Sequence, residues 1–224
     1  TLDNCIYGDI KFLYLSPERL QNELVQERIK KMKVNLIAVD EAHCVSQWGH
    51  DFRPAYLKII ALKEFFPKIP FLALTASATK RVQDDIITQL QLKNPAIFTK
   101  SFSRENLAYM VFNAEDKLHM MTQILKKYEQ PSIVYVTNRK SCTDVVKQLE
   151  ASNLTATFYH GGLAPKDKEK NMQLWMEEKV QIMVATNAFG MGIDKANVKT
   201  VIHLHLPQNL ENYYQEAGRA GRNG

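Results

Sequence analysis

The feature that most constrains the fold is a repeated alternation of short apolar runs with longer segments of helical pattern. The apolar runs are rich in Val, Ile, Leu and aromatic residues and are bounded by polar residues or Pro, which is typical of buried strands. Strands that alternate with helices favour parallel sheets covered by helices on both faces. The sequence therefore predicts an α/β protein. The expected strands are residues 9–16, 36–39, 70–75, 107–113, 132–136, 155–159, 180–185 and 200–206.

A polar connector between two sets of such elements predicts two domains. Residues 93–106 read as a short strand followed by polar residues, and strands and helices alternate on both sides of it. A chain of 224 residues is long enough for two modest domains. We therefore expect domains over residues 1–103 and 104–224. The expected helices are a segment from Pro17 that includes Ile29, and residues 54–66, 80–91, 115–128, 140–152, 165–178 and 208–217.

The composition excludes several classes of protein. Hydrophobic residues make up 45% and charged residues 24%, which is ordinary for a globular protein and argues against disorder. The three cysteines are far apart and form no CxxC pair, which argues against a zinc site or a disulfide framework and fits a reducing compartment. No apolar run reaches membrane-spanning length, so no membrane partner is expected. The net charge of +5 permits a polyanionic partner. Because the basic residues are spread evenly along the chain, any contact with such a partner is expected in local grooves and not in a basic tail.

Residues 36–56 are the most informative stretch of the chain. A short apolar run ends in Asp40 and Glu41, with His43 just after them and a loop dense in aromatic and polar residues beyond. The carboxyl ends of strands in open α/β sheets are where ligands bind. An acidic pair at a strand end is often only a cap for the next helix. Aromatic residues within a few positions of the carboxylates favour a functional loop instead, because such loops suit base stacking.

These residues resemble the motifs of one helicase family. Asp40-Glu41-Ala42-His43 has the spelling of the DEAH form of the Walker B motif of superfamily 2 helicases. The run over residues 43–54, HCVSQWGHDFRP, is similar to the aromatic-rich loop of the RecQ family of DNA helicases. The two together are a specific signal. The resemblance implies that five residues of this loop contact DNA: Gln47, Trp48, His50, Phe52 and Arg53.

The rest of the chain resembles further motifs of the same family. The matching segments are residues 15–20 (the SPERL motif), 75–79 (motif III), 133–139 (motif IV), 159–163 (YHAGL), 184–194 (motif V) and 215–222 (motif VI). Taken alone, an arginine in the SPERL segment could be a solvated helix residue. The histidine of the YHAGL-like segment, which reads YHGGL in this chain, could be a core residue whose hydrogen bonds are satisfied. The resemblance implies DNA contacts by Arg19, Thr137, Asn138, Arg139, His160 and Thr186, and nucleotide contacts by Gly192 and Asp194.

The resemblance also implies a mechanism and partners. It implies tandem RecA-like domains of the P-loop NTPase class, with ATP bound between them and single-stranded and duplex DNA as substrates. Asp40 would hold Mg²⁺, Glu41 would polarise the attacking water and His43 would sense the nucleotide. Motif VI would add Gln215 as a second sensor and Arg222 as the arginine finger, with Arg219 beside it. The implied activity is 3′ to 5′ DNA unwinding in repair and recombination.

A missing motif limits this interpretation. The phosphate-binding loop GxxxxGK[ST] does not occur in these 224 residues, and neither does the glutamine motif that reads adenine. We therefore expect a partial helicase core, truncated at the N-terminus of its first domain, that hydrolyses no ATP alone. The zinc-binding module of the family is expected outside this chain. An unprotected edge of the first sheet would favour self-association. The expected location is the bacterial cytoplasm with the nucleoid, or the nucleus in a eukaryote.

Two alternative functions stay open at this point. The first is another superfamily 2 ATPase that remodels nucleic acid, including an RNA-directed one, although the aromatic loop argues against it. The second is a non-catalytic module that binds DNA or a protein partner through the same surfaces. DNA-dependent ATP turnover separates the helicase from the second alternative, and a competition between RNA and DNA separates it from the first.

Overall fold

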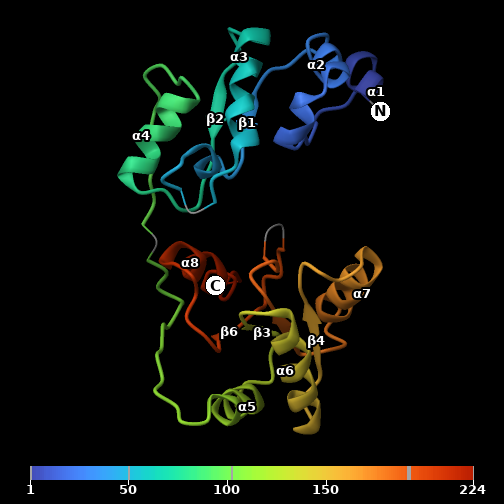
Figure 1. The fold of residues 1–224 in the computed structure, drawn as a ribbon, viewed down its shortest axis with the longest axis vertical. Helices are drawn as coiled ribbons and strands as arrows, with labels where there is room; N and C mark the ends of the chain where they lie inside the picture. The colour runs from blue at the N-terminus through green and yellow to red at the C-terminus, as the bar shows by residue number, and fades with distance from the viewer. Residues whose placement is uncertain (1, 50, 102, 191–192, 224) are drawn as a thin grey trace. The chain divides into compact units, whose positions relative to one another are not determined.

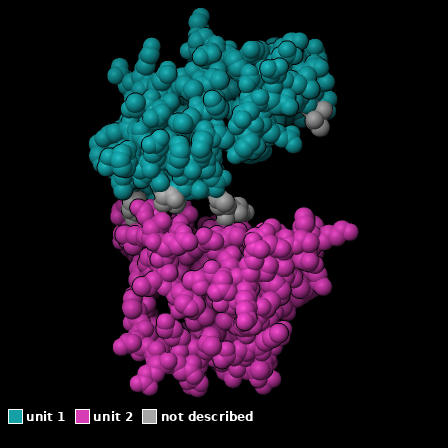
Figure 2. All heavy atoms as spheres, in the orientation of Figure 1, with its two compact units in different colours: residues 1–100 teal, residues 101–224 magenta. Residues whose placement is uncertain are grey.

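The computed structural model describes residues 2–49, 51–101, 103–190 and 193–223. The chain divides into two compact units, residues 1–100 and 101–224, hereafter unit 1 and unit 2 (Figure 2). Each unit has its own parallel sheet and its own set of helices (Figure 1). The units are therefore described separately.

Unit 1 is built around a parallel pair of strands, β1 (Ile37–Val39) and β2 (Phe71–Ala73), with Ile37 opposite Phe71. Helix α4 (Lys80–Gln89) packs Val82 and Ile86 into the core beside these strands. The short 3-10 helix η2 (Ala42–Val45) follows the end of β1 after two intervening residues and is buried along its length. The remaining elements of unit 1 are α1 (Leu2–Tyr7), η1 (Pro17–Gln21), α2 (Glu23–Ile29), η3 (Pro54–Ile60) and α3 (Ala61–Phe65).

Unit 2 contains a four-stranded parallel sheet in the order β4-β5-β3-β6. Strands β3 (Ser132–Tyr135) and β5 (Ile182–Ala185) are buried at every position, as expected for inner strands covered on both faces. Strands β4 (Ala156–Tyr159) and β6 (Thr200–His203) lie at the edges. The helices of unit 2 are α5 (Lys117–Lys127), α6 (Arg139–Ala151), α7 (Pro165–Met176) and α8 (Leu210–Ala217).

Alternate residues of β3 pack into two separate hydrophobic layers. Val134 packs with Met121 and Leu125 of α5 and with Leu149 of α6 on one face of the sheet. Its neighbours in β3 pack on the other face in a layer that includes Trp175 of α7. This division follows from the two-residue period of a strand, whose successive side chains point to opposite faces. Both faces of the sheet are therefore covered, as the sequence predicts.

Several helices begin directly after a residue whose side chain caps the helix N-terminus. The side chains of Thr79, Asp116, Asn138 and Asn209 accept hydrogen bonds from backbone N–H groups in the first turns of α4, α5, α6 and α8. Such caps satisfy donors that have no partner inside the helix. Because the cap is a local signal, the expected helices at 80–91, 115–128, 140–152 and 208–217 match observed helices to within a few residues. The expected helix at 165–178 also matches an observed helix, α7, which begins with a proline, Pro165.

Three strand predictions are wrong for the described residues. Residues 9–16 and 107–113 and the short run after residue 93 form no strand, and no strand of the described part lies beside them to supply backbone partners. Most of their apolar side chains face solvent instead, with Tyr14 90% and Val111 96% exposed. Strand propensity reflects packing against neighbouring strands more than an intrinsic backbone preference. An apolar run without such a neighbour stays irregular.

The helix expected from Pro17 is also interrupted. It forms as η1 and α2, separated by Asn22, whose backbone is extended and whose side chain caps α2 by accepting from the Val25 N–H. The helix expected at 54–66 is a 3-10 helix, η3, continued by α3. Within the described ranges, no helix is both long and apolar enough to cross a membrane.

Candidate functional site

The carboxyl end of β1 carries two acidic residues in an unusual backbone turn. Asp40 is exposed, and its Oδ1 accepts a hydrogen bond from the Glu41 N–H at 2.9 Å. Glu41 has φ 48° and ψ 43°, in the left-handed region that non-glycine residues rarely adopt. Strained backbone of this kind persists where surrounding structure holds it and clusters at functional sites. The turn makes this strand end a candidate site.

A buried hydrogen-bonded cluster joins the ends of β1 and β2. His43 is buried, and its Nδ1 lies 2.9 Å from Thr75 Oγ1 and 3.3 Å from Glu41 Oε2. The same Thr75 hydroxyl accepts from the Ser77 N–H at 3.3 Å, and the Ala42 N–H donates to the Leu74 carbonyl at 2.8 Å. Glu41 is thereby fixed relative to the 75–79 segment. The sequence predicts both segments as functional, and the structure places them together.

The aromatic loop, residues 44–53, is closed at its base by a hydrogen bond from the Arg53 N–H to the Cys44 carbonyl at 2.9 Å. Trp48 is 59% exposed, and the Cζ of Arg81 lies 3.3 Å from its ring centroid. Gln47 is exposed and Phe52 is half-buried. His50 lies outside the described residues.

Within the aromatic loop, Arg53 forms an ion pair with Asp51. The Arg53 guanidinium donates to Asp51 Oδ2 at 2.5 and 3.0 Å, and this hydrogen bond raises the pKa of Arg53 above its ordinary value. Arg53 therefore already has an anionic partner in the loop. Arg19, by contrast, is exposed on η1, and no ion pair of the described residues includes it.

Unit 2 carries an open groove of about 590 Å³ at the carboxyl ends of three neighbouring strands. Because β4, β5 and β3 are adjacent and parallel, the residues that follow them meet at one edge of the sheet. Hydrogen bonds from the Val136 N–H to the Ala185 carbonyl and from the Thr186 N–H to the Tyr159 carbonyl hold these strand ends together. The groove is lined by Thr137, Asn138, Arg139, Lys140, Gly161, Thr186, Asn187 and Ala188.

The start of α6 gives this groove the properties of an anion site. Asn138 caps the helix by accepting from the Ser141 N–H at 2.9 Å, and Arg139 and Lys140 follow at once. A helix N-terminus carries partial positive charge, so two cations there are unfavourable unless an anion binds. Arg139 lies over Gly162, where an added Cβ would come within 2.5 Å of its Nη1. The geometry suits a phosphate group.

Sequence reasoning predicted four of the eight residues that line this groove, and it missed one basic side chain, that of Lys140. Thr137, Asn138, Arg139 and Thr186 line it as predicted DNA-contact positions. His160 precedes Gly161 of the lining, and its ring stacks on Phe158 at 5.7 Å between centroids. Its buried Nδ1 has no hydrogen-bond partner among the described residues. Lys140 was not predicted, although two adjacent basic residues directly after an N-cap are a usable sequence signal.

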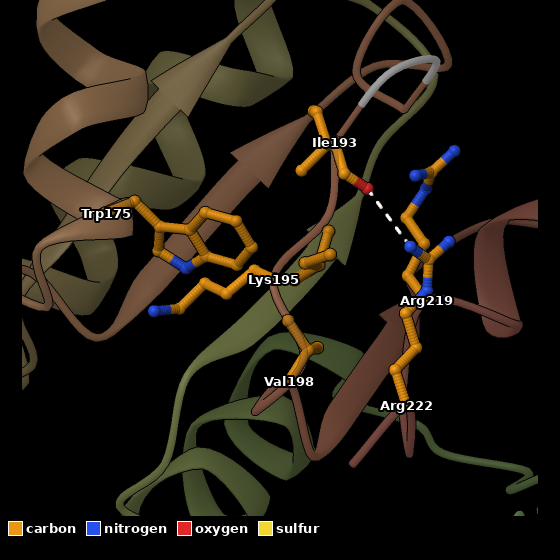
Figure 3. Close-up of a pocket in the computed structure, with 7 residues that line it drawn as sticks. Trp175, Ile193, Lys195, Val198, Arg219 and Arg222 are labelled. Carbon is orange, nitrogen blue, oxygen red and sulfur yellow. Dashed lines mark hydrogen bonds between the residues drawn. The ribbon is translucent and has the colours of Figure 1, made fainter.

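The predicted motif VI arginines lie close to the predicted motif V residues within unit 2. Arg222 Nη1 donates to Asp194 Oδ1 at 2.9 Å. It also donates to the Ile193 carbonyl oxygen at 3.4 Å, which is the dashed line in Figure 3. Arg219 lies against Gly190, where an added Cβ would come within 2.4 Å of its Nη2. Both arginines line a small pocket with Trp175 (Figure 3). Gln215 lies on α8, and Gly192 is outside the described residues.

A largely buried pair that the sequence did not reveal fixes α8 to the sheet. His203 Nε2 of β6 lies 2.8 Å from Glu216 Oε2 of α8, with the two side chains 13% and 12% exposed. The His203 ring stacks on Tyr135, whose hydroxyl donates to the Phe189 carbonyl at 3.0 Å. Burial raises the pKa of Tyr135 above its usual range, so this phenol stays a neutral donor. The contact holds the helix that leads into Arg219.

Comparison with known protein families identifies two helicase domains. The DEAD/DEAH box helicase family matches residues 2–86, and the helicase conserved C-terminal domain matches residues 116–224. The ATP-dependent DNA helicase RecQ of Bacillus subtilis (strain 168) is 42% identical over 219 residues, which are 97% of this chain and 37% of that protein. The ATP-dependent helicase SGS1 of Saccharomyces cerevisiae (strain ATCC 204508 / S288c) is 40% identical over 233 residues, which cover 100% of this chain and 16% of that protein. The chain thus spans less than half the length of these relatives.

Solved structures agree on the fold. S. cerevisiae Dbp5 bound to RNA and ADP BeF3 matches with a TM-score of 0.68 at 20% sequence identity, covering 89% of this chain and 54% of that chain. At this identity the likeness concerns the fold alone. It assigns the chain to the RecA-like α/β architecture, in which parallel sheets are flanked by helices.

Proposed function

Because this chain belongs to the RecQ family of superfamily 2 helicases, we propose that the protein that carries it couples ATP hydrolysis to the unwinding of DNA. One observation carries the proposal. Residues 40–53 present an exposed carboxylate at a strand end and, a few residues later, an exposed tryptophan in a closed loop. The first suits nucleotide chemistry and the second suits base stacking. A single short segment therefore serves both ligands.

Asp40 suits the binding of Mg²⁺ with a nucleotide. No group of three or more His, Cys, Asp or Glu residues able to hold a metal occurs among the described residues. Mg²⁺ is usually bound by one or two carboxylates together with substrate phosphates and water. The exposed carboxylate of Asp40 at the end of β1 fits that requirement. Bound Mg²⁺ would neutralise charge on the phosphates.

Glu41 is the proposed group that orients the attacking water. Its left-handed backbone and the contact with His43 at 3.3 Å hold the carboxylate in place. A carboxylate oxygen accepts a hydrogen bond from water and turns the water lone pair toward the phosphorus atom. His43 would transmit the state of this site to the 75–79 segment through its 2.9 Å contact with Thr75. Arg222 keeps its predicted role as the arginine that neutralises charge on the transferring phosphoryl group.

DNA would be held through phosphate and base contacts in different places. The groove at the start of α6 offers a helix N-terminus, two basic side chains and the Thr186 hydroxyl, which suit backbone phosphates. Trp48 offers an aromatic face that any base can use, which suits single strands without sequence preference. These contacts favour a nucleic-acid motor over a protein-binding module, and the 3′ to 5′ direction stays a prediction.

ATP hydrolysis by the full-length protein, with and without a single-stranded oligonucleotide, tests this function at fixed salt. Glu41→Gln is expected to reduce DNA-stimulated turnover by about a hundredfold or more, because it removes the group that orients water. The dissociation constant for DNA should stay unchanged. Glu64→Gln removes an exposed carboxylate of α3 in the same unit and serves as the matched control with normal turnover.

Three outcomes would contradict the proposal. A wild-type protein that shows no turnover under either condition would be a binding module. RNA that outcompetes DNA for binding would indicate an RNA-directed ATPase. Displacement of a strand only from substrates with a 5′ overhang would refute the predicted direction.

A further inference from the structure

Trp48 makes one contact that the proposed function does not use. The Cζ of Arg81 lies 3.3 Å from the centroid of the Trp48 ring, so the planar guanidinium covers one face of the indole. Trp48 is nevertheless 59% exposed. One face of the ring is covered by arginine, and more than half of the surface of the residue meets solvent.

Arg81 belongs to a firmly anchored element. It lies in the first turn of α4, beside Val82, which is buried in the core of unit 1 together with Ile86. The Thr79 side chain caps this helix by accepting from the Val82 N–H at 3.4 Å. Trp48, by contrast, lies in a surface loop outside regular structure. The contact therefore ties the loop to a fixed helix.

Within the part of the chain that the structure describes, no acidic partner explains the position of the guanidinium. Among the ion pairs of the described residues, none includes Arg81, whereas the adjacent Lys80 pairs with Asp84 at 2.7 Å. A cation above an indole is attracted by the negative face of the ring, and arginine adds planar stacking that lysine lacks. Contact with Trp48 is therefore the interaction that holds this side chain in place.

We propose that Arg81 is a positioning residue that holds Trp48 so that a base of single-stranded DNA stacks on the uncovered face of the ring. The inference rests on the proposed role of the aromatic loop in DNA binding. A ring held in place before DNA arrives loses less conformational entropy on binding. The base, the indole and the guanidinium then form three stacked layers, which accept any base.

Acrylamide quenching of tryptophan fluorescence tests the contact without DNA. The chain has two tryptophans, and Trp175 is 0% exposed, so the quenchable signal from this chain belongs to Trp48. In the full-length protein, that signal is the difference between wild type and Trp48→Phe. Arg81→Lys is expected to increase the quenching constant of this difference signal. An unchanged constant would show that Arg81 does not cover the ring and would overturn the proposal.

Binding of a single-stranded oligonucleotide, followed by fluorescence anisotropy, separates positioning from charge. Arg81→Lys keeps the charge and removes the planar stack, so the dissociation constant should rise about three- to fivefold. Its salt dependence should not change, because no positive charge is lost. Lys80→Gln is the matched control for loss of charge at the neighbouring position. Wild-type affinity for Arg81→Lys, with equal losses for Arg81→Gln and Lys80→Gln, would reduce Arg81 to a general charge and overturn the proposal.

A double-mutant cycle separates failure of this inference from failure of the proposed function. In a Trp48→Ala background, Arg81→Lys is expected to cause no further loss of affinity, because the ring that it positions is gone. Losses that multiply would refute the positioning role. If Trp48→Ala weakens binding and Arg81→Lys does not, only the present inference fails. If Trp48→Ala binds DNA as tightly as wild type, the DNA-binding role of the loop fails as well.

Discussion

At the scale of single residues, two cysteines show how packing sets chemistry. Cys44 lies at the base of the aromatic loop and Cys142 lies inside α6, and both are buried. Burial raises the pKa of each thiol from 9.0 to about 11. Near neutral pH these residues therefore behave as small apolar groups and not as nucleophiles.

We predict that alkylation will distinguish these cysteines from Cys5, which is half-buried on α1. At pH 8 a thiol of pKa about 11 is ionised in roughly one molecule in a thousand, and only the thiolate reacts. Iodoacetamide treatment of the native protein, followed by mass spectrometry, should therefore modify Cys5 first. Equal labelling rates at Cys5 and Cys44 would contradict the buried environment described for Cys44.

The same pKa shifts predict a loss of stability in alkaline solution. Well below pH 9 the thiols are protonated in both the folded and the unfolded chain. As the pH rises from 9 to 11, they ionise in the unfolded chain first, so the free energy of unfolding decreases across this window. Cys44→Ala or Cys142→Ala should flatten this pH dependence, measured by denaturant unfolding, whatever the effect on stability at neutral pH.

At the scale of secondary-structure elements, the first turn of α6 combines a structural and a functional requirement. Its cap, Asn138, satisfies a backbone donor, while Arg139 and Lys140 add positive charge where the helix dipole is already positive. Each such cation costs about 0.3–1 kcal/mol in the absence of a nearby anion. A phosphate in the groove would remove this cost, which links binding to the stability of the helix.

Asn138→Ala is expected to destabilise unit 2 by about 1 kcal/mol and to weaken DNA binding, because the loss of the cap frays the turn that lines the groove. Denaturant unfolding and fluorescence anisotropy measure the two effects. Asp116→Ala removes the equivalent cap from α5 and should cost similar stability without weakening DNA binding. Its loss of negative charge could only tighten binding, so equal weakening in both variants would refute a special role for α6.

The elements also show what a single sequence can predict. Helix starts follow from capping residues a few positions away, so α4, α5, α6 and α8 were predictable. The position of the Asp40 and Glu41 carboxylates at a strand end was predictable, because both residues come directly after the apolar run that forms β1. Residues 107–113 have strand composition but no adjacent strand in the described residues, and composition alone cannot supply one.

Two contacts that escaped sequence reasoning join distant positions through packing. His203 lies on strand β6 and Glu216 on helix α8. Arg81 lies on α4, which begins after β2, whereas Trp48 lies in the loop before β2. Each residue type is ordinary at its own position. Only the folded arrangement reveals the pair, so no local pattern could have predicted it.

At the scale of the whole molecule, the chain contains two separately packed cores. The core of unit 1 gathers around β1, β2 and α4, while that of unit 2 fills both faces of a four-stranded sheet. A sheet with two buried inner strands removes more apolar surface from water than a pair of strands does. Unit 2 is therefore expected to be the more stable unit.

Differential scanning calorimetry of the chain should show two transitions, with unit 1 unfolding at the lower temperature. Ile86→Ala should lower the midpoint temperature of only the first transition, and Leu149→Ala that of only the second. Each substitution should reduce the free energy of unfolding of its unit by about 2–5 kcal/mol. Both substitutions remove a buried side chain of similar size, so each is the control for the other. A single transition that shifts equally in both variants would show that the units unfold as one.

The order of strands in unit 2 also imposes an order on local opening. Strand β3 is paired on both sides, by β5 and by β6, so its amide hydrogens can exchange with solvent only after a neighbour has detached. The edge strands β4 and β6 carry no such restriction on their outer sides. Thr137 and Asn138 follow β3 after only one further residue, Val136, so the part of the groove that they form should be the last to lose its shape when the sheet opens from its edges.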